Sequence, residues 1–172
     1  MGIEFYIAQG ISVLTCIVAI LMMQWKTMKK ILLGQIAANL LTASTYFLLG
    51  GFSGAGICFI AIFQSIVMFF YSLKKSPPHR WVIALFLALY VGCSAVCYRS
   101  PGDILSALAA IAFAMSVVQT KPSLSRLWYL FNPLFWLCYD ILTYAVGNFL
   151  LHLVVFVSTL IAIFRNDLPK KK

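Results

Sequence analysis

Seven long apolar runs, separated by short polar turns, fill almost the whole chain. Most runs approach the number of residues, roughly 20, that an α-helix needs to cross a lipid bilayer. The separators are built from charged residues, Gly, Pro and Ser, as turns between helices require. We expect seven antiparallel spans, at roughly 5–25, 31–49, 54–73, 81–98, 104–119, 127–146 and 148–164.

The composition excludes a soluble domain. Of 172 residues, 63% are hydrophobic and only four are acidic, and the mean hydropathy is +0.97. A soluble domain of this size leaves a large share of its surface in water, so it could not hide this much apolar surface. The sequence therefore predicts an all-α membrane protein whose main partner is the lipid bilayer.

The positions of the basic residues predict the orientation. All thirteen Lys and Arg residues except Arg99 fall in the first, third and fifth separators or in the C-terminal tail. Because basic residues are retained on the cytoplasmic side, the N-terminus is expected outside and the C-terminus in the cytoplasm. The same basic face could be taken as a site for RNA or anionic lipid. A topology signal is the simpler interpretation, and no nucleic-acid partner is expected.

An internal repeat appears when the sequence is shifted against itself by 93 positions. Residues 31–73 then lie over 124–166 without a gap. An Asn, a Tyr and a Gly match, and these residues are more informative than Leu or Phe in so apolar a chain. The matches are Asn39 with Asn132, Tyr46 with Tyr139, and Gly54 with Gly147.

The offset predicts two parallel three-helix bundles joined by a linker helix, an arrangement of three, one and three. An offset of 93 residues is long enough to contain a triplet of helices and a fourth helix that links it to the second triplet. Because the linker is a single helix, both triplets run in the same direction across the membrane. The first bundle is expected at 1–73, the linker helix with its flanking loops at 74–103, and the second bundle with the basic tail at 104–172.

Two segments carry a family resemblance. The stretches QWKTMKKILLGQIAANLLTASTYFLLGGFSGAG and FWLCYDILTYAVGN resemble the YgjV-type bacterial inner-membrane proteins, and the arrangement of helices is similar to the SWEET and PQ-loop superfamily. The Pro-Gln pair that names PQ-loop proteins is absent, since this chain has MMQW and VVQT at the corresponding places. The resemblance implies a multi-pass protein of the bacterial inner membrane with a solute site between the triplets.

Asn39 and Asn132 are the strongest candidates for binding a solute. An amide inside a membrane helix is costly unless it is paired or faces a cavity, and a symmetric pair could hydrogen-bond a small polar molecule from both sides. Tyr46, Tyr139 and Gln35 are weaker candidates for the same site. The alternative is that the two Asn residues form interhelical hydrogen bonds that hold each triplet together.

Asp140 and His152 are candidates for proton coupling. They lie on either side of the Gly147-Asn148 turn, at matching depth on adjacent antiparallel helices. An ionised carboxylate there is costly, so it is expected to be protonated, to pair with the imidazole or to face water. A structural hydrogen bond, or two side chains that reach separately toward the interface, is the alternative.

The sequence thus predicts a carrier that moves a small neutral or zwitterionic solute by alternating access. A non-transporting membrane scaffold or assembly factor is the alternative. No catalytic set can be assembled from two His and four acidic residues, so we expect no enzyme, metal or cofactor. The oligomeric state is left open, because two triplets in one chain already build a complete pseudo-dimer.

Overall fold

The computed structural model describes residues 3–48, 52–98, 102–143 and 146–167, and in these residues every regular element is an α-helix. The expectation of an all-helical protein with seven helices is confirmed. The helices are α1 (Ile3–Gln24), α2 (Met28–Leu48), α3 (Phe52–Leu73), α4 (Arg80–Val96), α5 (Asp103–Val117), α6 (Pro122–Thr143) and α7 (Val146–Asn166).

Four segments of these helices are long and apolar enough to cross a membrane. They are all of α1 and α2, Ala55–Leu73 of α3, and Phe149–Asn166 of α7. The helices α4 and α5 are apolar but shorter, with 17 and 15 residues. A chain with several such helices is built to sit in lipid, because each helix satisfies its own backbone hydrogen bonds.

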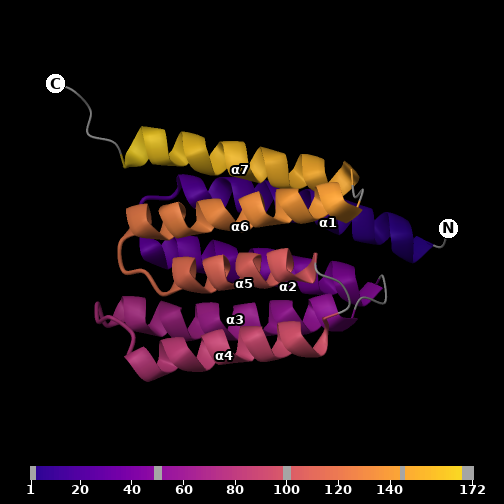
Figure 1. The fold of residues 1–172 in the computed structure, drawn as a ribbon. Helices are drawn as coiled ribbons and strands as arrows, with labels where there is room; N and C mark the ends of the chain where they lie inside the picture. The colour runs from indigo at the N-terminus through magenta and orange to yellow at the C-terminus, as the bar shows by residue number, and fades with distance from the viewer. Residues whose placement is uncertain (1–2, 49–51, 99–101, 144–145, 168–172) are drawn as a thin grey trace.

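The helices form a ring in which each one contacts the next along the chain, and α1 closes the ring against α7. Two further contacts cross the ring, between α3 and α5 and between α2 and α6. Because α3 and α5 touch directly, α4 lies outside them at the edge of the bundle (Figure 1). Its buried residues Val82, Phe86 and Tyr90 recur every four residues and form one narrow stripe.

The two halves of the chain pack in the same order. The helix α2 contacts both α1 and α3, and α6 contacts both α5 and α7. This order is compatible with the repeat that the sequence contains. The division into three, one and three helices, with boundaries after residues 73 and 103, stays a prediction.

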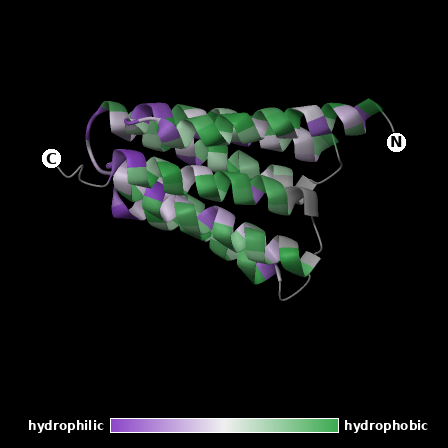
Figure 2. Cartoon of the chain, turned by 90° about the horizontal axis from the view of Figure 1, so that it is seen from above, coloured by the Kyte–Doolittle hydropathy of each residue, from purple (hydrophilic) through white to green (hydrophobic). Residues whose placement is uncertain are grey.

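The positive charge gathers at one end of the bundle, which we call the basic end. Arg99 and the three C-terminal lysines lie outside the described residues, and each of the other nine Lys and Arg residues is near this end. Figure 2 shows the hydrophilic residues concentrated there, with an apolar middle. The alternation of charged and uncharged turns therefore corresponds to an alternation of helix direction. The assignment of the basic end to the cytoplasm stays a prediction.

The helices α1 and α2 approach each other closely near the basic end, and Gly34 makes this possible. A Cβ atom added to Gly34 would lie 2.5 Å from the Cβ of Met22 and 2.9 Å from the Trp25 ring. Met22 itself is almost completely buried. No side chain larger than hydrogen fits at residue 34 without moving one of the two helices.

The helix α6 begins five residues earlier than the expected start at 127. Pro122 occupies its first position, where the missing N–H of proline has no cost and its fixed φ favours a helix. The segment of Ser and Arg residues that follows was expected to be a turn because it is polar. Arg126 consequently lies inside a helix, with only 1% of its side chain exposed.

Candidate functional site

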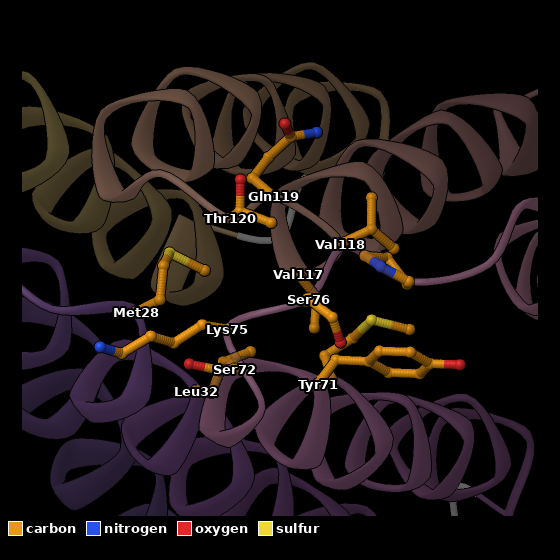
Figure 3. Close-up of a pocket in the computed structure, with 12 residues that line it drawn as sticks. Met28, Leu32, Tyr71, Ser72, Lys75, Ser76, Val117, Val118, Gln119 and Thr120 are labelled. Atoms are coloured by element: carbon orange, nitrogen blue, oxygen red, sulfur yellow. The ribbon is translucent and has the colours of Figure 1, made fainter.

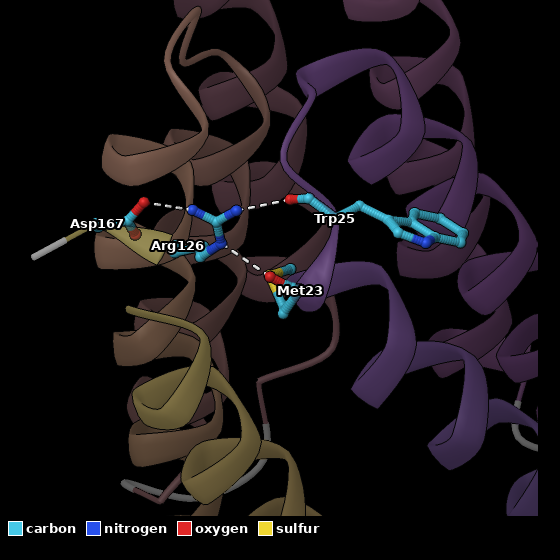
Figure 4. A network of polar contacts seen from close by, with 4 residues as sticks. All are labelled: Met23, Trp25, Arg126 and Asp167. Carbon is cyan, nitrogen blue, oxygen red and sulfur yellow. Dashed lines mark hydrogen bonds and ion pairs between the residues drawn. The ribbon is translucent and has the colours of Figure 1, made fainter. Parts of the chain in front are cut away.

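Arg126 ties three helices together at the basic end (Figure 4). Its Nε donates to the Met23 carbonyl at 2.8 Å, and its Nη2 donates to the Trp25 carbonyl at 2.6 Å. Its Nη1 forms an ion pair with Asp167 Oδ1 at 2.5 Å. The last carbonyls of a helix have no partner within the helix, so Arg126 satisfies the end of α1 while it pairs with the residue after α7. We call these four residues the Arg126 network.

A second polar contact joins α1 to α7 beside this network. The Gln24 amide nitrogen donates to the Ser158 carbonyl at 3.1 Å and lies 3.3 Å from the Ser158 hydroxyl. The Ser158 hydroxyl lies 3.5 Å from the Ile20 carbonyl. The side of the basic end formed by α1, α6 and α7 is therefore closed by specific polar contacts.

The opposite side of the basic end is hollow. A cavity of about 200 Å³, which we call the vestibule, lies between α2, α3 and α5 and the turns that follow α3 and α5. Figure 3 shows its lining side chains converging from these segments. The lining comprises Met28, Leu32, Met68, Tyr71, Ser72, Lys75, Ser76, Pro78, Val117, Val118, Gln119 and Thr120.

The vestibule is polar at its mouth and apolar at its deepest point. Lys75, Ser76, Gln119 and Thr120 come from the turns at the basic end. Leu32, Met68 and Val117 are the lining residues farthest from that end in their respective helices, and each is almost completely buried. We call these three residues the floor, because they separate the vestibule from the interior of the bundle.

Three polar side chains lie one helical turn beyond the floor. Gln35 follows Leu32 by three residues, while Ser65 and Gln64 precede Met68 by three and four, so each lies on the same helix face as its floor residue. The Gln64 amide nitrogen donates to the Ala114 carbonyl at 3.2 Å, which is one turn from Val117. Gln35, Gln64 and Ser65 therefore form a polar layer at one depth, with contributions from α2 and α3 and a contact to α5.

Much of the hydrogen-bonding capacity of the polar layer is unused. All three side chains are 0% exposed. Neither the nitrogen nor the oxygen of the Gln35 amide has a hydrogen-bond partner among the described residues, and the same holds for Gln64 Oε1 and Ser65 Oγ. A buried polar atom without a partner costs on the order of 1–3 kcal/mol. Such a cluster is expected where water or a ligand completes the hydrogen bonds.

Comparison with protein families identifies the chain. A family model described as a bacterial inner membrane protein, Imp-YgjV, matches residues 6–170. The chain belongs to the Imp-YgjV family. The match covers nearly all of the chain, so the protein is a multi-pass protein of the bacterial inner membrane. Neither the curated proteins nor the solved structures contain a match to it.

In this Imp-YgjV protein the two Asn candidates are each bonded within their own half. The Asn39 amide nitrogen donates to the Gln35 carbonyl at 2.8 Å in its own helix. The Asn132 amide nitrogen donates to the Ala109 carbonyl of α5 at 2.9 Å. Both side chains are half-buried, and neither contributes to the vestibule lining. A role for the pair in solute binding stays a prediction.

Gln35 is the sequence candidate that the structure places beside the vestibule. Tyr46 is half-buried near the other end of α2. Tyr139 lies with its hydroxyl 3.4 Å from Asp103 Oδ1, so it links α6 to the start of α5. These two tyrosines are therefore remote from the polar layer along their helices.

His152 stacks on a neighbouring aromatic ring. Its imidazole is nearly parallel to the Trp136 ring, at an interplanar angle of 12° and a centroid distance of 5.6 Å. This contact joins α7 to α6 near the end opposite the basic end. The side chain of Asp140 lies outside the described residues, so proton coupling through Asp140 and His152 stays a prediction.

Gln64, Ser65 and Arg126 are not among the predicted site residues, although signals for them exist in the sequence. Gln35 precedes Gly50 by fifteen residues and Ser65 follows it by fifteen, which places both at one depth on adjacent antiparallel helices. For Arg126, the signal is Pro122 at a favoured helix start. Within the described residues, no group of three or more His, Cys, Asp or Glu side chains could hold a metal ion.

Proposed function

We propose that the protein is a carrier that moves a small, polar solute without net charge across the inner membrane by alternating access. One observation carries the proposal: a vestibule open at the basic end stops at an apolar floor, and a buried amide without a partner, Gln35, lies directly beyond it. In a carrier, this arrangement corresponds to a closed state in which the floor covers the solute site.

The chemistry of the polar layer supports an uncharged or zwitterionic solute. Two amides and one hydroxyl offer both donors and acceptors, and none of the three side chains carries a charge. A solute with an uncompensated charge would lose its hydration without gaining a counterion, which is costly inside a membrane. A solute would reach the polar layer through the vestibule, whose volume of about 200 Å³ is smaller than the roughly 300–1,000 Å³ typical of sites for drug-sized ligands. Such a path favours a solute of few atoms.

The distribution of polar contacts supports a movement of α2 and α3 against the rest. The Arg126 network and the Gln24–Ser158 contact hold α1, α6 and α7 together. The floor side chains Leu32, Met68 and Val117 make apolar contacts between α2, α3 and α5. Their separation would also break the hydrogen bond from Gln64 to the Ala114 carbonyl, which would free the Gln64 amide for a solute. Separation of the floor would connect the vestibule to Gln35, as alternating access requires.

A membrane scaffold is the second candidate, and the Asn132 contact favours it. The bond from Asn132 to the Ala109 carbonyl is the kind of interhelical contact that a purely structural role predicts. The two functions give Gln35 different roles. In a carrier its unpartnered amide binds the solute, whereas in a scaffold a buried amide without a partner would only lower stability.

Uptake into liposomes tests the proposal. Purified protein is reconstituted and assayed for exchange of radiolabelled zwitterionic amino acids, neutral sugars and polyols, with anionic and cationic solutes as comparison. We expect saturable exchange of one neutral or zwitterionic class, abolished by Gln35→Leu and retained in Gln9→Leu, which replaces an exposed amide of α1 that does not line the vestibule. Absence of exchange for every class, or undiminished exchange in Gln35→Leu, would contradict the proposal.

A further inference from the structure

A second hollow lies on the outer side of the bundle, between α3 and α4. It has a volume of about 530 Å³ and an almost entirely apolar lining. The α3 side contributes Phe59, Phe63 and Tyr71, and the α4 side contributes Trp81 and Leu85. The hollow exists because α4 buries only one narrow stripe against its neighbours. We call it the α3–α4 groove.

The groove has the length of one membrane leaflet. Its α3 side runs from Phe59 to Tyr71, and twelve residues at 1.5 Å each span about 18 Å. Half of a hydrocarbon core of about 30 Å is about 15 Å. Phe63 is 69% exposed and Trp81 is 66% exposed, so in a membrane the groove faces acyl chains.

The end of the groove nearest the basic end is polar and positively charged. Tyr71 and Trp81 stand at this end, as aromatic residues do at the interface between lipid and water. Lys74 and Arg80, both exposed, lie just beyond them. The helix α4 begins here, and its N-cap residue His79 makes no side-chain capping bond. The Val82 N–H already donates to the His79 carbonyl at 3.0 Å, so the N–H groups of Arg80 and Trp81 are the ones available to an anion.

We propose that the α3–α4 groove binds one anionic phospholipid from the leaflet at the basic end. One acyl chain lies along the groove, and the phosphate group is held by Lys74, Arg80 and the start of α4. Basic pockets between membrane helices bind anionic headgroups in this way. Tyr71 lines both the groove and the vestibule, so the lipid would lie one side chain away from the solute path.

Lipid binding to the purified protein in an uncharged detergent tests the site. Phosphatidylglycerol and phosphatidylcholine with identical acyl chains are titrated, and bound lipid is counted by native mass spectrometry alongside the change in Tm. We expect one tightly bound phosphatidylglycerol that raises the Tm, and no comparable effect of phosphatidylcholine. The double variant Lys74→Ala/Arg80→Ala should weaken this binding about 30-fold, at roughly 1 kcal/mol for each cation.

Two further variants separate the groove from a general attraction to the basic end. Lys29→Ala/Lys30→Ala removes the same charge from the start of α2 and should leave the affinity unchanged. Leu85→Trp fills the groove without removing charge and should abolish the tight site. Equal binding of both lipids, or an equal loss in the two double variants, would overturn the proposal. So would a dimer that Leu85→Trp dissociates, because the groove would then be an interface between copies of the chain.

Discussion

Gln35 is the residue at which stability and function are expected to conflict. Its side chain is fully buried, and neither polar atom of its amide has a partner among the described residues. Leu has nearly the same volume and needs no hydrogen bond. Gln35→Leu should therefore raise the free energy of unfolding by about 1–2 kcal/mol, because the penalty of an unsatisfied amide disappears.

Reversible unfolding in detergent micelles checks this expectation, with Gln119→Leu as the control. Gln119 is half-buried, and its amide donates to the Met115 carbonyl at 2.8 Å, so its replacement should give no gain. A loss of stability in Gln35→Leu would show that the amide is well bonded in the folded protein. The combination of greater stability and lost transport is typical of a residue kept for activity.

At the level of single residues, the sequence made Gln35 a candidate but did not predict which side chains the structure groups with it. Gln35 was a candidate because amides are rare in membrane helices. Its proximity to Gln64, Ser65 and the floor depends on the packing of α2 against α3 and α5. No periodicity within one helix carries that information. The Asn pair was favoured because of the repeat, whereas in the structure Asn39 donates within α2 and Asn132 donates to a carbonyl of α5.

Among the helices, the Arg126 network is the strongest polar connection that the described residues show. Arg126→Met would leave two carbonyls at the end of α1 and the Asp167 carboxylate without their donor. We expect a loss of about 3–5 kcal/mol in unfolding free energy, as for other buried ion pairs broken on one side. Arg165→Met is the control, because Arg165 is exposed in the last turn of α7. Equal melting temperatures for the two variants would contradict a structural role for the network.

The approach of α1 to α2 makes a second prediction about helix packing. Gly34→Ala should destabilise the protein by about 1–3 kcal/mol, because the new methyl group would overlap the Cβ of Met22. Gly92→Ala in α4 meets nothing within 4 Å, so it should be neutral or stabilising by up to about 1 kcal/mol. Thermal unfolding of both variants distinguishes local crowding from a general effect of replacing glycine. A Gly34→Ala variant as stable as the wild type would show that the helices can separate without cost.

The helices themselves were largely predictable, since charge and turn residues mark their ends. The principal difference is the start of α6, where the polar residues after Pro122 continue the helix. Hydropathy alone places such residues in a loop. It carries no information on whether a polar side chain is buried and hydrogen-bonded to another helix. Arg126 is such a side chain, and its acceptors on α1 lie about a hundred residues away in the chain.

At the scale of the whole molecule, the protein is a ring of helices that is held by polar contacts on one side of the basic end and hollow on the other. The bonded side joins α1, α6 and α7, and the hollow side contains the vestibule above its apolar floor. Membership of the Imp-YgjV family places this ring in the bacterial inner membrane. We propose that the polar layer beyond the floor becomes accessible from each side of the membrane in turn.

The accessibility of a thiol at residue 35 can be measured from each side of the membrane without knowledge of the solute. Gln35→Cys is introduced into a variant that lacks the five native cysteines, and a membrane-impermeant maleimide is applied from either side of oriented proteoliposomes. Thr159→Cys, which replaces a residue of α7 that is fully buried and bonded to the Val155 carbonyl, serves as the buried control. We expect the thiol of Gln35→Cys to be labelled from both sides and that of Thr159→Cys from neither. A thiol at residue 35 that resists labelling from both sides would contradict alternating access to the polar layer.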